Sequence, residues 1–330
     1  MGLWRGKRAA GGVLLVWLAC GGIAPLGAAV GFIANDVYLG NEGNSSIAHL
    51  AADGSGGSTI FQNGFGDPFT MTGMAFDSAG ENLFYAREGG DGNLRRLDSS
   101  YASTLVASTR PGGGTLNVFD VARGANGHIY ALTLGNTEII DFGLDGNGPG
   151  VTVFDAGTSL GQTLGFTINS AGEFFFSNVG TNEVLKVTGF STTTIFANGS
   201  DGLGDPFQLA VDSEDRIYVA DRTAGIVRFT EAHNGTTIGN MASHGGAFAI
   251  DVDSSGNIYS TSFSSELYKF DSAGTPLGSV PFADNSDGLS SPRSLAVAPT
   301  PEPSPALLAI AAAMLAAGLR RRPAHRRACN

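Results

Sequence analysis

Few residues of this 330-residue chain have both the type and the spacing needed for metal binding or catalysis. Asp251, Asp253 and Ser255 alternate like the first ligands of a calcium-binding loop, and Gly256 stands where such a loop turns. The twelfth position of that loop needs a bidentate glutamate, but Ser262 stands there, so we expect an ordinary hairpin turn. The internal histidines share no metal-ligand spacing: they are His49, His128, His233 and His244.

A larger pattern exists in short aromatic segments that recur at intervals of 41 to 47 residues. Their aromatic residues are Tyr38, Tyr85, Tyr130, Phe175, Tyr218 and Tyr259. Such a period is typical of an array of similar units. Turn residues bracket short apolar strands in every unit, and no helical period is sustained between the two end segments. The sequence therefore predicts an all-β, six-bladed β-propeller over residues 30–299, with about four strands in each blade.

One unit spells its strand pattern with unusual clarity. It reads Gln208-Leu-Ala-Val-Asp212, then a turn, then Ile217-Tyr-Val-Ala-Asp221. This phrase resembles the NHL repeat, whose pattern is Gly-Ile-Ala-Val-Asp, a turn, and Ile-Tyr-Val-Ala-Asp. The resemblance extends from Asn35 to Pro299, although Arg123-Gly124 replaces Val-Asp in the third unit. It implies an NHL-like six-bladed propeller.

The two ends of the repeat predict how the ring closes. Residues 294–299 begin a seventh copy of the inner strand with no aromatic strand after it, whereas Tyr38 has no inner strand before it. We expect the C-terminal fragment to complete the first blade and to leave no free sheet edge there. Three similar loops at 63–69, 202–207 and 287–292 precede inner strands, and their prolines favour blade-to-blade turns.

Polar residues also stand three positions after each aromatic marker. They are Asn41, Glu88, Thr133, Asn178, Asp221 and Ser262. If the strands are in register, this polar ring occupies one end of the second strands, on the face of the proline-containing loops. Related six-bladed lactonases and esterases bind a divalent metal there through Glu, Asn and Asp. The resemblance therefore implies a ligand or metal site, with Ca²⁺ as the ion, at Asn41, Glu88, Asn178 and Asp221. The alternative is that these residues only cap the ends of strands.

The C-terminal segment, residues 300–330, has the order of a sorting signal followed by a membrane anchor. Pro301, Glu302, Pro303 and Ser304 precede an apolar run at 305–319 and a basic end at 320–327 that starts with Arg320, Arg321 and Arg322. A helix over 306–319 would be about 21 Å long, which is short for a bilayer core of about 30 Å. The arginines would stay on the cytoplasmic side of this short transmembrane helix. An amphipathic tail or a core helix is the alternative.

This order of motif, apolar helix and basic end resembles the PEP-CTERM sorting tails of exported proteins from Gram-negative bacteria. The resemblance implies processing by the membrane protease exosortase, with transient anchoring in the inner membrane and then delivery to the cell surface or beyond. It carries no information about activity.

The N-terminal segment agrees with export. Arg5, Lys7 and Arg8 precede an apolar stretch at 9–19, and Ala28 and Ala29 offer a cleavage site for small residues. Residues 1–29 are therefore predicted to be a signal peptide that engages the Sec machinery. A lipoprotein signal ending at Cys20 is the alternative.

Charge and cysteine content limit the possible partners of the mature domain and the interactions that can stabilise it. Without its end segments the chain has 11 basic and 29 acidic residues, a net charge of −18. Such a surface excludes nucleic acid and anionic lipid as partners and suits divalent cations or simple solvation. Both cysteines, Cys20 and Cys329, lie in the end segments, so the core alone must hold the mature domain together.

Two hypotheses about function remain open. The one we favour is a noncatalytic surface or matrix propeller that binds exopolysaccharide, surface proteins or small molecules. It rests on the export signals and on the lack of a convincing catalytic set. Its alternative is a calcium-dependent, lactonase-like or lyase-like propeller enzyme.

Overall fold

The computed structural model describes residues 31–62, 70–88, 92–135, 137–241, 244–278 and 280–300. The predicted signal peptide and sorting tail lie outside these ranges. Among the described residues, no helix has the length and apolar character to cross a bilayer.

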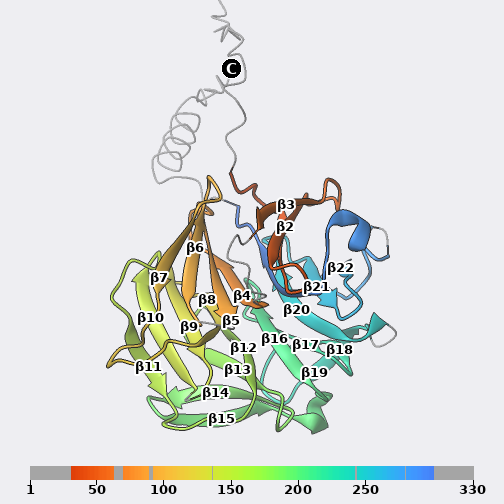
Figure 1. Cartoon of the computed structure of the whole chain (residues 1–330). Helices are drawn as coiled ribbons and strands as arrows, with labels where there is room; N and C mark the ends of the chain where they lie inside the picture. Colours follow the sequence, from red (N-terminus) through yellow and green to blue (C-terminus); the bar gives the residue numbers. More distant parts are fainter. Residues whose placement is uncertain are drawn as a thin grey trace, which may run out of the picture. The chain divides into compact units, whose positions relative to one another are not determined.

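Six β-sheets of similar size form the blades of the propeller (Figure 1). Blade 1 contains β23 (Pro292–Val297), β1 (Val37–Asn41), β2 (Ser46–Leu50) and β3 (Ser58–Gln62). Blade 2 contains β4 (Thr70–Phe76), β5 (Asn82–Glu88), β6 (Leu94–Asp98) and β7 (Ser103–Ala107). Blade 3 contains β8 (Val118–Arg123), β9 (His128–Thr133), β10 (Glu138–Leu144) and β11 (Val151–Asp155).

The second half of the ring repeats the same order. Blade 4 contains β12 (Thr163–Ile168), β13 (Phe174–Asn178), β14 (Glu183–Gly189) and β15 (Thr192–Ala197). Blade 5 contains β16 (Pro206–Val211), β17 (Ile217–Asp221), β18 (Gly225–Phe229) and β19 (Gly235–Gly239). Blade 6 contains β20 (Ala247–Val252), β21 (Ile258–Ser262) and β22 (Leu267–Phe270), to which the bridges of Ala283 and Pro276 add an irregular outer edge.

The predicted closure of the ring is confirmed. Strand β23 pairs antiparallel with β1, with Val297 opposite Val37 and Ala296 opposite Tyr38. Beyond the strand, the amide of Ala298 donates to the carbonyl of Asp36 at 2.9 Å. The last strand therefore joins the first in one sheet, which protects the inner edge of blade 1.

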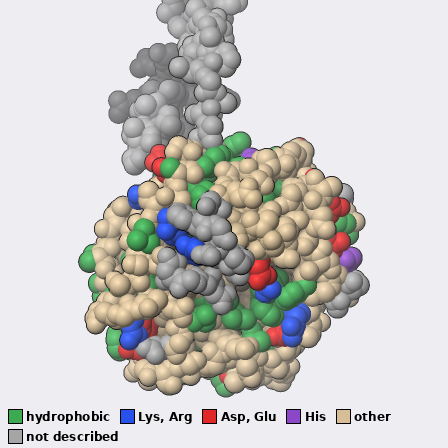
Figure 2. Space-filling model, in the orientation of Figure 1, with side chains coloured by type: hydrophobic (Ala, Val, Ile, Leu, Met, Phe, Trp, Pro, Cys, Tyr) green, Lys and Arg blue, Asp and Glu red, His purple; other side chains and the backbone are tan. Residues whose placement is uncertain are grey.

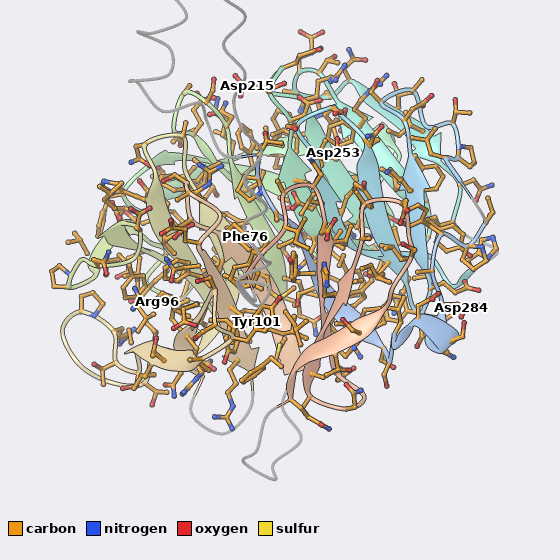
Figure 3. The ribbon with its side chains drawn as sticks, turned by 90° about the horizontal axis from the view of Figure 1, so that it is seen from above. Phe76, Arg96, Tyr101, Asp215, Asp253 and Asp284 are labelled. Carbon is orange, nitrogen blue, oxygen red and sulfur yellow. The ribbon has the colours of Figure 1, made fainter. Side chains whose placement is uncertain are left out.

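All six aromatic markers lie in the second strands and are buried, as the repeat predicted. They help to fill the apolar layers between neighbouring blades. Between blades 1 and 2, Tyr38, Phe76 and Tyr85 pack in one cluster, and Phe32 and Tyr101 cover it. Figure 3 shows Phe76 and Tyr101 near one another. Because each large apolar side chain contributes about 1.5–3 kcal/mol when buried, these layers hold the blades together without disulfides.

Every inner strand carries a β-bulge at the same place, near its second residue. In blade 3 the pairing shifts between Val118 and Asp120, and the other five blades shift at the equivalent position. A bulge adds one residue and re-aims the side chains beside it. The propeller therefore has a repeated break in register where each inner strand begins.

The inner strands also approach one another closely at the axis. A Cβ atom on Gly73 of blade 2 would lie 2.5 Å from the Cα of Asp120 in blade 3. Likewise, a Cβ on Gly165 of blade 4 would lie 2.6 Å from the Cα of Gln208 in blade 5. The Nε2 of Gln208 donates to the carbonyl of Thr72 at 2.5 Å and so joins blade 5 to blade 2, which stand opposite in the ring. This bond crosses the central channel.

The propeller has two different faces. We call the loop face the end where inner strands begin, which includes the connections at 198–205 and 284–291. We call the hairpin face the opposite end, with the turns between first and second strands, such as Asp212–Arg216 and Asp253–Asn257. Figure 3 shows Asp215 and Asp253 in the same part of the view and Asp284 apart from them. In the face that Figure 2 shows, charged side chains form small scattered groups among polar and apolar ones.

Candidate functional site

The predicted polar ring has the register that its spacing required. Each member is the last residue of a second strand and pairs with the first residue of the inner strand in its blade. Asn41 stands opposite Pro292, for example, and Asp221 opposite Pro206. The ring therefore lies on the loop face, beside the proline-containing loops.

Asp221 uses its carboxylate to hold two loops. Its Oδ2 accepts from the amides of Gly204 and Asp205 at 2.8 and 2.9 Å. Its Oδ1 accepts from the amide and the hydroxyl of Thr223 and from the amide of Ala224, at 2.8 to 2.9 Å. Five donors thus surround a fully buried carboxylate. Both oxygens of this carboxylate are therefore engaged by donors of the chain itself.

The two asparagines of the ring also contact loops. Asn41 accepts from the amide of Ser290 at 3.0 Å and donates to the carbonyl of Gly288 at 3.0 Å. Asn178 donates to the carbonyl of Leu160 at 2.5 Å, and its buried Oδ1 has no hydrogen-bond partner. In both blades the side chain ties the second strand to the loop that precedes the inner strand.

The remaining ring members are Thr133, Ser262 and Glu88. Thr133 bonds to Glu138 at the start of β10, and Ser262 bonds to Glu266 just before β22. Glu88 ends β5, and its side chain lies outside the described part of the structure. Among the described residues, no group of three or more His, Cys, Asp or Glu side chains is close enough to hold a metal ion.

Two of the three predicted blade-to-blade loops are described, and they have the same local structure. A short 3₁₀ turn leads into each of them, η1 (Gly199–Asp201) into the loop at 202–207 and η3 (Asn285–Asp287) into the loop at 287–292. Asn198 and Asp284 cap these turns through capping boxes, and the next glycine ends each turn with a positive φ. The loops therefore lead into β16 and β23 as predicted. The third loop, at 63–69, lies outside the described residues.

A cavity opens on the opposite, hairpin face. It is a funnel of about 1090 Å³ along the central channel, bounded by inner strands and by turns that include Ser78, Asn126 and Ser254. Two inner-strand carboxyls, Asp120 and Asp251, line it from opposite blades. Its volume is typical of a ligand cleft.

The two funnel carboxyls are bonded mainly by backbone amides of neighbouring strands. Asp120 accepts from Val121 and from Phe166 of blade 4, both at 2.8 Å. Asp251 accepts from Val252 and from Val297 of blade 1, also at 2.8 Å. Burial raises the pKa of Asp120 to about 8 and that of Asp251 to about 6, because the amides only partly offset the lost hydration. Both groups therefore titrate in a range suited to proton transfer.

Sequence reasoning missed these two carboxyls. The available signal was an acidic residue inside an apolar strand, as in Val118-Phe-Asp120-Val and Ala249-Ile-Asp251-Val. In the sequence, Asp251 stands out only as the first position of a calcium-like loop. The structure instead places it within β20, and Asp253 accepts from the amides of Ser255 and Asn257 as a hairpin turn does. The predicted turn is therefore confirmed.

A serine motif also went unnoticed in the sequence. Gly157-Thr-Ser159-Leu-Gly161 has the Gly-x-Ser-x-Gly spacing of a nucleophile elbow. Such an elbow joins a strand to a helix, whereas this segment connects β11 to β12. The Oγ of Ser159 bonds within its own turn, to the carbonyl of Gly161 at 3.2 Å. The context is that of a loop.

Comparisons with known proteins define the fold class. No protein-family model matches this chain, and no curated protein matches its sequence. The structure is similar to a chain in the crystal structure of a nidogen/laminin complex, with a TM-score of 0.62 and 15% identity, over 80% of this chain and 98% of that one. It is also similar to a streptogramin B lyase structure, with a TM-score of 0.55 and 13% identity, over 76% and 82% of the two chains. At these identities the likeness shows the fold alone, a six-bladed β-propeller.

Proposed function

We propose that this chain is an exported, noncatalytic binding propeller of the cell surface or extracellular matrix. The observation that carries the proposal is the state of Asp221, whose carboxylate receives five hydrogen bonds from its own loops. Because the Asp221 carboxylate fixes the loops around it, it supports a rigid binding surface rather than a catalytic centre. These bonds favour the capping role, the alternative to a metal site, for Asp221.

The location and the partners in this proposal rest on the sequence of the end segments. The Sec machinery would export the chain, its signal peptide would be cleaved after Ala29, and exosortase would process it near Pro301–Ser304. Exopolysaccharide or other surface proteins would then be its partners. The net charge of −18 keeps such a domain soluble and away from anionic lipid.

Mass spectrometry of protein released from the native host tests the sorting step. We expect the released form to lack residues 320–330, and we expect a host without exosortase to retain an uncut form in its membrane. An intact C-terminal peptide on the secreted protein would contradict processing. Cosedimentation of the released protein with matrix from the same cells then tests binding, with heat-denatured protein as the control.

A second function has one observation in its favour. Enzyme sites often contain carboxyls with raised pKa values in a cleft, and Asp120 and Asp251 fit that description. A lactonase-like or lyase-like reaction would then take place in the funnel. Turnover abolished by Asp251→Asn with an unchanged melting temperature would support this alternative.

A further inference from the structure

A compact group of aromatic and charged side chains lies on the loop face of blades 5, 6 and 1. Each blade contributes two equivalent residues, the second residue of its inner strand and the residue that follows its ring member. The six residues are Phe207 and Arg222, Phe248 and Phe263, and Arg293 and Glu42. We call this group, together with Asp205, the arginine–phenylalanine platform.

Phe263 is the exposed centre of the platform. Its side chain is 39% exposed, whereas Phe207 and Phe248 are buried beneath it. The ring of Phe263 meets both of them edge to face, with centroid distances of 5.7 and 4.7 Å. Such contacts fix the orientation of an aromatic ring. The chain therefore holds a large apolar side chain in one orientation at the surface without covering it.

Two guanidinium groups flank this ring. The central carbon of Arg222 lies 6.0 Å from the ring centre of Phe263, and that of Arg293 lies 5.9 Å from it. Each arginine is held by a carboxylate, since Arg222 pairs with Asp205 and the Nε of Arg293 donates to Glu42 at 2.5 Å. Stacking and pairing together leave the guanidinium groups little freedom to reorient.

The other half of the loop face lacks this chemistry among the described residues. The equivalent positions in blades 2 to 4 are apolar: Met71, Phe119, Leu134, Leu164 and Val179. Blade 3 has an arginine–carboxylate pair of its own, Arg110 with Glu138, but the equivalent positions beside it hold the apolar Leu134 and the buried Phe119 rather than an exposed aromatic ring. This asymmetry distinguishes the platform from a repeated structural feature of the blades.

The chemistry of the platform matches a sugar ring. A pyranose has an apolar face of C–H groups, which packs on an aromatic ring, and a rim of hydroxyls that both donate and accept. The platform supplies donors from two arginines and an acceptor from Glu42 at that rim, whereas the buried Asp205 holds Arg222 in place. Each positive charge is already balanced by its partner, and the domain has a net charge of −18, so an anionic chain is disfavoured.

We propose that the arginine–phenylalanine platform binds a neutral polysaccharide, with Phe263 stacked on a sugar ring. This inference rests on the proposed binding function and names the ligand class and the site. The site is separate from the funnel on the hairpin face, so changes to the platform leave Asp120 and Asp251 in place.

Affinity electrophoresis of the mature protein tests the proposal, with neutral glucans, galactans and mannans and an anionic polyuronate in the gel. We expect retardation by at least one neutral polysaccharide and none by the polyuronate. Phe263→Ala should weaken the binding at least tenfold, and Arg222→Lys should weaken it severalfold, because lysine keeps the charge but loses the planar contact. Phe190→Ala is the matched control, since Phe190 is 59% exposed and lies outside the platform.

The outcomes separate this inference from the proposed function. Neutral polysaccharide binding that persists in Phe263→Ala would overturn the platform and leave the binding function standing. Retardation by the polyuronate alone, or by none of the polysaccharides, would overturn the neutral ligand class. Equal losses in Phe263→Ala and Phe190→Ala would show that exposed phenylalanine in general, not the platform, carries the binding.

Discussion

The two ends of the central channel are built from the same six inner strands, but their polar side chains have different hydrogen-bond partners and different access to solvent. On the loop face, Asp221 and Asn41 are tied into their own loops, and apolar side chains crowd the strand starts. On the hairpin face, Asp120 and Asp251 face an open funnel and receive only backbone donors. The comparison shows that one repeat can form a rigid loop surface at one end and a cavity lined by titratable carboxyl groups at the other.

Strand β23 spans both ends, so its removal gives the largest expected effect. Truncation before Ser294 should expose the edge of β1 and lose the burial of Leu295 and Val297, which lowers the free energy of unfolding by about 3–6 kcal/mol. Truncation after Pro299 should leave it unchanged. Thermal unfolding of both proteins checks this, and equal melting temperatures would contradict the closure of blade 1 by β23.

The inner strands approach one another closely at the axis, and this packing separates the loop-face end of the channel from the funnel. Gly73→Ala would push a Cβ into the backbone of Asp120 and should destabilise the protein by about 1–3 kcal/mol. Gly199→Ala is the control, because a Cβ there meets no atom within 4 Å. Denaturant unfolding compares the two variants. An unchanged midpoint for Gly73→Ala would show that the channel is looser than described.

Asp221 tests whether the loop face is structural. Asp221→Asn turns one acceptor oxygen into a donor that faces amide groups, so a loss of about 1–3 kcal/mol in unfolding free energy is expected. Calcium removal by a chelator should not mimic this loss. A stable variant whose calcium-dependent rise in melting temperature has vanished would instead assign Asp221 to a metal site.

The funnel should give the protein a pH-dependent stability through Asp120. The folded pKa of Asp120, about 8, lies above the unfolded value of about 4, so the folded state holds the proton more tightly. Stability from this group is complete below pH 4 and is lost as the pH rises through 8, by up to about 1.4 kcal/mol per unit. Asp120→Asn should remove that slope. Parallel stability curves for wild type and variant would contradict the assignment.

Sequence alone could predict the blades, the closure and the polar ring because these follow from local periods. Tyr218 and Asp221 are three residues apart on one strand, so their relative placement depends on no distant contact. The roles of Asp120 and Gln208 depend on contacts between blades, to Phe166 and Thr72, that no local pattern records. The platform was missed for the same reason, because Arg222, Phe263 and Arg293 belong to three different blades.

The central claim is that this propeller binds a ligand and does not convert it. Turnover of a panel of lactones and aryl esters by the mature protein, with Ca²⁺ supplied or chelated, tests it most directly. The account predicts no turnover above the uncatalysed rate in either condition. Robust calcium-dependent hydrolysis that is lost in Glu88→Ala or Asp221→Ala, while the fold survives, would contradict it and make the polar ring an active site.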